Sequence, residues 1–218
     1  MMSFNGMIWG FLMTSLLILG TGGHASVVIE SALDSGKNII GLLDTDYKNQ
    51  QEEILGVRVL GGIDMLNDYL STDVSIIVAI GDNEKRRMWF LRLKEMGYKL
   101  ASIINPSAIV SNSCNIGEGV FINSGAIINA MSVIGDNSII NTGVIVEHEV
   151  KIGKNCHLAP GVNVGGRTTI GQNSFIGIGT SIANHISIER EVVIGGGSVI
   201  VKNVEQGSTV VGIGRIIS

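Results

Sequence analysis

The residues best suited to chemistry lie in the stretch GVIVEHEVKIG, residues 143 to 153. Here His148 stands between Glu147 and Glu149, in a run that otherwise alternates small, apolar and turn residues. Histidine is well suited to take a proton near neutral pH, and a neighbouring carboxylate increases its basicity. The triplet therefore predicts either a general base or a polar group on the outside of a strand, and the elements that position it must decide between the two.

The composition indicates tightly turned β structure. Charged residues make up 16% of the 218 residues, against roughly 25% in an average domain. The chain has 30 Gly and two Pro, with many Ile and Val. A net charge of −4 argues against a nucleic-acid partner, because phosphate binding requires a basic surface. The two cysteines form neither a disulfide framework nor a metal motif, so we expect reduced thiols and no metal.

A repeat of six residues dominates the second half of the chain. Every sixth residue from Ile104 to Ile200 is Ile, Val or Leu, at seventeen consecutive positions. A period of six is the signature of a β-helix of hexapeptide repeats. Each side of a triangular coil turns one aliphatic residue inward, while Gly, Asn and Ser suit the corners. We therefore predict a parallel β-helix over residues 105–218.

Residues 14–104 have a different pattern. Short apolar runs at 15–20, 37–44, 74–82 and 98–104 alternate with helical segments at 24–35 and 83–96. The second helix has a cap at Asp82 or Asn83 and stops at Gly97. Alternation of this kind predicts an α/β domain with a short parallel sheet, Rossmann-like in type.

The apolar N-terminus is not predicted to cross a membrane. It has no positively charged start, and its uninterrupted apolar stretch is shorter than the roughly 20 residues of a span. We take residues 1–13 as an extension of the folded chain. One hypothesis is that Met13 is the true start and that residues 1–12 are disordered.

The first strand is followed by a glycine-rich turn. Gly20-x-Gly22-x-x-Ala25 fits the dinucleotide fingerprint, and Asp44 lies about 20 residues further on. Backbone N–H groups at such a helix start suit a diphosphate. A nicotinamide dehydrogenase is one alternative, although the domain is short for a full dinucleotide fold. The basic cluster at 83–87 is expected to be a solvated face, with Arg86 as its candidate for a phosphate contact.

These features together resemble a known family. The six-residue repeat, Gly20-Thr21-Gly22-Gly23-His24, Asp44, Gly81-Asp82-Asn83 and the Glu-His-Glu triplet are similar to bacterial hexapeptide-repeat sugar acetyltransferases. That family includes UDP-4-amino-sugar N-acetyltransferases and sialic-acid O-acetyltransferases. The resemblance implies a left-handed β-helix, acetyl-CoA as co-substrate, a homotrimer, a cytoplasmic enzyme and a product for surface polysaccharide synthesis. One departure is the end of the chain, residues 211–215, which lacks the family's proline turn.

The resemblance also implies roles for single residues. His148 would be the general base, oriented by Glu149, and a backbone N–H at Gly165-Gly166 would hold the developing oxyanion. His185 has no assigned role and is expected on the surface. Contacts with the nucleotide sugar are expected from Gly22, Gly23, His24, Asp44, Thr45 and Gly81. Contacts with acetyl-CoA are expected from His157, Gly166, Ile178 and Gly196.

Three functions remain open at this stage. The first is acetyl transfer from acetyl-CoA to the amino group of a nucleotide-linked 4-amino-4,6-dideoxy sugar. The second is O-acetylation of sialic acid or a related sugar hydroxyl by the same histidine. The third is a non-catalytic scaffold that binds a nucleotide sugar.

Overall fold

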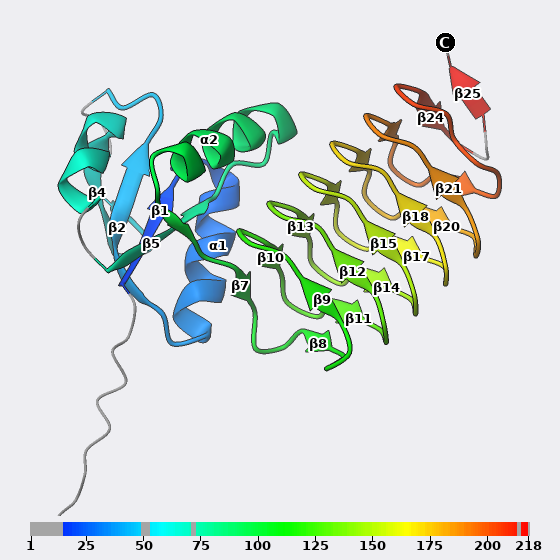
Figure 1. Cartoon of the computed structure of the whole chain (residues 1–218), viewed down its shortest axis with the longest axis horizontal. Helices are drawn as coiled ribbons and strands as arrows, with labels where there is room; N and C mark the ends of the chain where they lie inside the picture. The colour runs from blue at the N-terminus through cyan, green and yellow to red at the C-terminus, as the bar shows by residue number, and fades with distance from the viewer. Residues whose placement is uncertain (1–14, 49–52, 71–72, 213–214, 218) are drawn as a thin grey trace, which may run out of the picture.

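The computed structural model describes residues 15–48, 53–70, 73–212 and 215–217. The expected extension at residues 1–13 lies outside this part of the chain. The first half is an α/β domain and the second a β-helix, as Figure 1 shows. The left-handed β-helix and the Rossmann-like domain predicted from the sequence are confirmed.

The sheet of the α/β domain has the order β3-β4-β2-β1-β5-β6. All its neighbouring strands are parallel except the β3–β4 pair. The predicted helices form with small shifts at their ends, and Asp82 caps the second by accepting a hydrogen bond from the Lys85 N–H. The elements are β1 (Ser15–Leu19), α1 (Gly23–Asp34), β2 (Asn38–Asp44), β3 (Glu53–Ile54), β4 (Val57–Gly62), the 3₁₀ helix η1 (Ile63–Tyr69), β5 (Val74–Val78), α2 (Asn83–Glu95) and β6 (Lys99–Leu100).

The segment from β3 to η1 was not predicted from the sequence. The β3–β4 hairpin turns at Leu55 and Gly56, which both have positive φ (50° and 75°). Two successive residues with positive φ are typical of a type I′ hairpin turn, which Asn-Gly or Asp-Gly would have signalled far more clearly than Leu-Gly.

The strands of successive coils form three parallel β-sheets, which we name S1, S2 and S3. S1 contains β7 (Ile103–Ile104), β10 (Phe121–Ile122), β13 (Ile139–Ile140), β16 (His157–Leu158), β19 (Phe175–Ile176), β22 (Val193–Ile194), β24 (Thr209–Val211) and the antiparallel β25 (Arg215–Ile217). S2 contains β8 (Ile109–Val110), β11 (Ile127–Ile128), β14 (Ile145–Val146), β17 (Asn163–Val164), β20 (Ser181–Ile182) and β23 (Val199–Ile200). S3 contains β9 (Asn115–Ile116), β12 (Val133–Ile134), β15 (Lys151–Ile152), β18 (Thr169–Ile170) and β21 (Ser187–Ile188).

The aliphatic repeat forms the central stack of the coils. From Ile122 to Ile200 every residue of the repeat is buried, and burying one such side chain stabilises the fold by roughly 1.5–3 kcal/mol. The first residue, Ile104, is 38% exposed, because it lies in the first coil and has no coil beneath it. After Ile200 the period slips, since Ile194 pairs with Val210, two residues short of a full coil of 18.

The α/β domain packs against the outer face of S1. Ile103, Phe121 and Ile139 of that face share one buried cluster with α1 and the strands of the domain. Hydrogen bonds reinforce this contact, among them the one from the Asn83 side chain to the Ser174 carbonyl (3.2 Å). S2 and S3 therefore face away from the α/β domain, and this arrangement decides where the site residues lie.

Candidate active site

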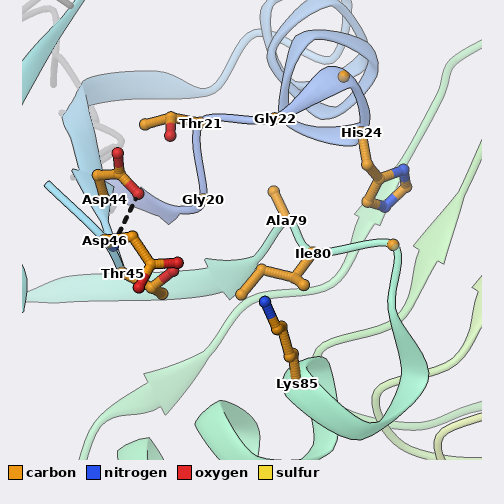
Figure 2. Close-up of a pocket in the computed structure, with 12 residues that line it drawn as sticks. Gly20, Thr21, Gly22, His24, Asp44, Thr45, Asp46, Ala79, Ile80 and Lys85 are labelled. Atoms are coloured by element: carbon orange, nitrogen blue, oxygen red, sulfur yellow. Dashed lines mark hydrogen bonds between the residues drawn. The ribbon is translucent and has the colours of Figure 1, made fainter. Parts of the chain in front are cut away.

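A cleft of about 370 Å³ lies at the carboxyl ends of β1, β2 and β5. The strand order places β2 and β5 on opposite sides of β1, which is the switch point where open α/β sheets bind ligands. Figure 2 shows the turn after β1 on one side, the end of β2 with Asp44 on another, and Ala79 and Ile80 beside them. All six residues expected to contact the sugar nucleotide line this cleft: Gly22, Gly23, His24, Asp44, Thr45 and Gly81.

The helix start in this cleft is open for an anion. Gly22 is the N-cap of α1, and no side chain caps the helix. A Cβ added at Gly22 or Gly23 would meet no atom within 4 Å. The first N–H groups of a helix have no partners within the helix, and they attract negative charge. The residues present therefore fit a diphosphate that approaches the backbone closely.

The cation of the cleft is Lys85, not the expected Arg86. Lys85 lines the cleft from the first turn of α2, and Figure 2 shows its amine directed toward Ile80 and the cleft. Arg86 is 1% exposed. It donates to the carbonyls of Ile80 and Gly81 and, across the interface, of Asn137, Asn155 and Cys156. The prediction that Arg86 is solvated and reaches a phosphate is wrong, because the helix face that carries it packs on the β-helix.

His24 and His157 meet at the border between the cleft and S1. Their ring centroids are 6.4 Å apart. Burial, helped by the Arg86 charge, lowers the pKa of His157 to about 4, and burial and His157 lower the pKa of His24 to about 3. Neutral His157 donates from Nδ1 to the Gly81 carbonyl (3.3 Å), and its Nε2 lies 3.4 Å from the Asn141 amide nitrogen. His157 is thus fixed beside Gly81, and its contact with acetyl-CoA stays a prediction.

His148 lies at the corner between S2 and S3. The corner residues 147–150 join β14 to β15. His148 is half exposed, and its Nδ1 is 3.0 Å from Glu149 Oε2. A carboxylate only accepts, so neutral His148 donates from Nδ1 and keeps its lone pair on Nε2. Within the described residues, no group hydrogen-bonds Nε2, so this atom is available to take a proton.

Two further residues of the same corner bind Glu149 and Gly166, and the sequence had not shown their roles. Arg167 Nε donates to Glu149 Oε2 at 2.8 Å. The Asn184 side chain accepts from the Gly166 N–H at 3.0 Å. The signal that could have found them is the coil length, because Arg167 and Asn184 lie 18 residues after Glu149 and Gly166.

Gly166 lies directly against the His148 ring. A Cβ on Gly166 would come within 2.8 Å of His148 Nε2, so the ring itself requires glycine here. The Gly166 N–H is engaged by Asn184, and the Gly165 N–H donates to the Ile182 carbonyl (2.9 Å). Both N–H groups thus have an acceptor within the chain, and the oxyanion contact expected at Gly165-Gly166 stays a prediction.

Ile178 and Gly196 lie together at the corner between S1 and S2. Ile178 is 62% exposed, and a Cβ on Gly196 would be 3.0 Å from its Cγ2. An exposed aliphatic side chain beside a flat glycine surface fits an apolar, flexible ligand such as a pantetheine chain. A separate groove on the S2 face is lined by Ile145, Glu147, Asn163, Val164, Gly165, Ser181 and Ile182.

The predicted site residues thus form three groups in one chain. The six cleft residues and His157 lie on the S1 side, where the α/β domain packs. His148, Glu149 and Gly166 lie at the S2–S3 corner, opposite S1, while Ile178 and Gly196 lie at the S1–S2 corner. A single chain does not bring the cleft and His148 together.

The part of the chain that the structure describes has neither a metal-binding cluster nor a membrane-spanning helix. Within this part of the chain, no cluster of three or more His, Cys, Asp or Glu residues could hold a metal ion. No helix in the described ranges is long and apolar enough to cross a membrane.

Comparisons with known proteins agree with this geometry. Residues 15–93 match the PglD N-terminal domain family, and residues 131–166 and 167–202 match the bacterial transferase hexapeptide (six repeats) family. A comparison with curated protein sequences found no match. Solved structures that cover nearly the whole chain supply the remaining evidence.

PerB from Caulobacter crescentus, solved with CoA and GDP-perosamine, is 35% identical, with a TM-score of 0.88 over 94% of this chain and 97% of that one. A histidine-to-asparagine variant of perosamine N-acetyltransferase from the same organism, with the same two ligands, gives a TM-score of 0.89 at the same identity and coverage. The acetyltransferase domain of PglB from Neisseria gonorrhoeae FA1090, in complex with acetyl coenzyme A, is 34% identical, with a TM-score of 0.85 over 91% and 96% of the two chains. The chain therefore belongs to the hexapeptide-repeat sugar N-acetyltransferases.

Proposed function

We propose that this protein transfers the acetyl group of acetyl-CoA to the amino group of a nucleotide-linked 4-amino-4,6-dideoxy sugar. The observation that carries the proposal is the 3.0 Å contact between His148 Nδ1 and Glu149 Oε2, which leaves Nε2 open beside Gly166. The open helix start in the cleft supports a nucleotide diphosphate as the handle of the acceptor. The ligands of PerB, CoA and GDP-perosamine, favour an amino sugar over a sugar hydroxyl.

The chemistry needs one base and no metal. The sugar amine attacks the thioester carbonyl carbon, and His148 Nε2 takes the proton that the nitrogen loses. The C–S bond then breaks, and the imidazolium returns the proton to the departing CoA sulfur. Glu149 keeps the ring in the Nδ1–H tautomer and stabilises the imidazolium, as the carboxylate of a catalytic triad does. The pKa of Glu149 is lowered by its bonds to Arg167 and His148, so it is ionised at neutral pH.

We infer a homotrimer in which each active site is shared between chains. The cleft lies on the S1 side and His148 at the opposite corner, so the base must come from a neighbouring copy. The outer face of S2 carries Ile109, Ile127 and Ile145, and Ile109 is 65% exposed. A cyclic trimer would cover this apolar row and place one chain's corner against the next chain's cleft. Such an enzyme would act in the cytoplasm, where acetyl-CoA and nucleotide sugars occur, and its product would supply surface polysaccharide synthesis.

The test is CoA release from acetyl-CoA with a panel of acceptors. The panel contains UDP- and dTDP-linked 4-amino-4,6-dideoxy sugars, GDP-perosamine, and free and CMP-linked sialic acid. We expect release with one amino sugar and a loss of about 10²–10⁴-fold in kcat in His148→Ala, with acceptor binding retained. Release only with sialic acid would make the enzyme an O-acetyltransferase. Acceptor binding without any release, in the wild type as in the variant, would indicate a scaffold and refute the proposal.

A further inference from the structure

The S2–S3 corner carries long side chains where the S1–S2 corner carries Gly and the S3–S1 corner carries mostly Asn. One residue in each corner adopts positive φ, at every sixth position from Gly119 to Gly197. At the S1–S2 corner this residue is glycine in coil after coil, at Gly125, Gly143, Gly161, Gly179 and Gly197. At the S3–S1 corner it is Gly119, then asparagine at Asn137, Asn155 and Asn173, and then Glu191 (φ 61°). At the S2–S3 corner it is Met131 (φ 63°), Glu149 (59°), Arg167 (60°) and His185 (62°).

Such residues are unfavourable in this conformation. A side chain with a Cβ crowds the backbone at positive φ, and only Gly, and to a lesser degree Asn and Asp, adopt it readily. The coil itself does not require Glu149 or Arg167, since glycine serves the same turn at the S1–S2 corner. Residues held in unfavourable backbone conformations are common at functional sites. Met131, His185 and Glu191 adopt the same conformation, so Glu149 and Arg167 are distinguished by their contacts with His148.

Arg167 contacts both members of the catalytic pair. Its Nε donates to Glu149 Oε2 at 2.8 Å, and its backbone N–H donates to the His148 carbonyl at 3.0 Å. Glu149 Oε2 is the same oxygen that accepts from His148 Nδ1. One carboxylate oxygen is therefore held from one side by the guanidinium and from the other by the imidazole.

This geometry fixes the direction of the carboxylate. Glu149 is partly exposed, with 36% of its side chain accessible, so without Arg167 it could rotate toward water. The charged hydrogen bond from Arg167 also contributes most to keeping the pKa of Glu149 low. A fixed, ionised carboxylate selects the imidazole tautomer with the proton on Nδ1, and this leaves the lone pair on Nε2.

We propose that Arg167 is a positioning residue for acetyl transfer, which holds Glu149 so that Glu149 orients His148. The inference rests on the proposed role of His148 as base. Arg167 acts through Glu149 and is not proposed to touch either substrate. The variant that tests this is Arg167→Asn, because asparagine accepts the positive φ of this corner and removes only the guanidinium.

The first measurement reports the tautomer of the His148 ring and does not depend on turnover. The chain has four histidines, so ¹⁵N-histidine labelling gives a spectrum that His148→Ala can assign. We expect His148 to carry its neutral-state proton on Nδ1 in the wild type, and a mixture with the Nε2–H tautomer to appear in Arg167→Asn. Arg190→Met, which changes an exposed arginine of another corner, is the control and should leave the spectrum unchanged. An unchanged His148 signal in Arg167→Asn would overturn the proposal.

The second measurement is a double-mutant cycle on kcat. A residue that acts through another contributes less than the base itself, so we expect Arg167→Asn to lower kcat about tenfold with both KM values unchanged. Arg167→Lys should recover part of that loss. In a Glu149→Gln background, Arg167→Asn should cost nothing further. If Arg167→Asn still lowered kcat about tenfold in the Glu149→Gln background, or raised the KM for acetyl-CoA, Arg167 would contact substrate instead.

The two ideas can fail separately. If the wild type releases no CoA with any acceptor, or if His148→Ala keeps its turnover, the proposed function fails. The tautomer measurement then still decides whether Arg167 positions the ring. If His148→Ala is inactive while Arg167→Asn keeps the wild-type kcat and tautomer, only the role of Arg167 is wrong.

Discussion

Three glycines surround the turn after β1, and they are glycine for different physical reasons. Gly20 has φ +128°, and a Cβ there would lie 2.6 Å from the Ala79 carbonyl oxygen. The packing of β1 against the end of β5 therefore requires it. A Cβ at Gly22 or Gly23 would meet nothing, so neither the backbone nor the packing explains these two residues. The proposed ligand that approaches the helix start would explain them.

Substitutions at this turn should separate stability from binding. Gly23→Glu places a carboxylate in the first turn of α1, where the helix dipole favours it by about 0.3–1 kcal/mol, so the melting temperature should not fall. The same charge should repel a diphosphate and weaken nucleotide-sugar binding at least tenfold, or about 1.4 kcal/mol. Isothermal titration calorimetry and thermal unfolding measure the two effects.

The matched control is Gly20→Ala, which should lower the stability of the domain, whereas Gly23→Glu should lower nucleotide-sugar binding. Its Cβ clash and positive φ should destabilise the α/β domain by about 2 kcal/mol or more. If Gly23→Glu bound the nucleotide sugar as tightly as the wild type, the diphosphate would not lie at the start of α1.

At the scale of elements, α2 is the joint between the two halves of the chain. It carries a buried arginine, Arg86, which donates hydrogen bonds to backbone carbonyls of both the α/β domain and the β-helix. Burial lowers the pKa of Arg86 to about 10, which still leaves it charged at neutral pH. Because Gly81 accepts from Arg86 and from His157, this joint also fixes one wall of the cleft.

Removing this arginine should loosen the joint. Arg86→Met leaves buried carbonyls without a donor, and we expect a loss of about 3 kcal/mol in the free energy of unfolding. Urea denaturation measures this loss. Arg87→Met is the matched control, because the Arg87 side chain is 43% exposed and forms a long ion pair with Glu84, at 3.8 Å. That variant should change stability by less than about 0.5 kcal/mol. Equal effects of the two substitutions would show that Arg86 is not structural.

At the scale of the whole molecule, the separation of the cleft from His148 is the basis of the proposed assembly with a shared site. The α/β domain covers S1, whereas His148 lies at the corner of the two other sheets. An assembly with a shared site can be tested by complementation. Two variants with defects in different parts should restore each other only if one site uses both chains. The nucleotide sugar is kept well below its KM, so that the weaker binding of Gly23→Glu lowers its own rate at least tenfold.

Co-expressed His148→Ala and Gly23→Glu chains should regain activity. In a cyclic trimer, a working site needs an intact cleft from one chain and an intact histidine from the next, which random mixing gives in about a quarter of the sites. We therefore expect up to about a quarter of the wild-type rate of CoA release. The double variant His148→Ala/Gly23→Glu expressed alone is the control and should be inactive. No recovery in the mixture would place the complete site within one chain.

The sequence alone determined the coils and the chemistry of the candidate groups. An aliphatic residue every six positions permits only a structure with that period, because the central stack admits one buried side chain per side. The family resemblance implied that the glycine-rich turn and Asp44 line one cleft, whereas the position of the Glu-His-Glu triplet at a corner of the coil was not predicted. The three cleft residues Gly22, Gly23 and His24 needed no long-range information.

The tertiary structure decided everything that depends on contacts between distant coils. Arg86 is buried instead of solvated because α2 packs on S1, which no local pattern in residues 83–87 shows. The Gly166 N–H is taken by Asn184, and Arg167 reaches Glu149, because coils 18 residues apart lie in register. The distance between the cleft and His148 follows from which sheet the α/β domain covers. Which sheet the α/β domain covers depends on the shape and burial of whole surfaces. It cannot be read from the spacing of residues along the chain.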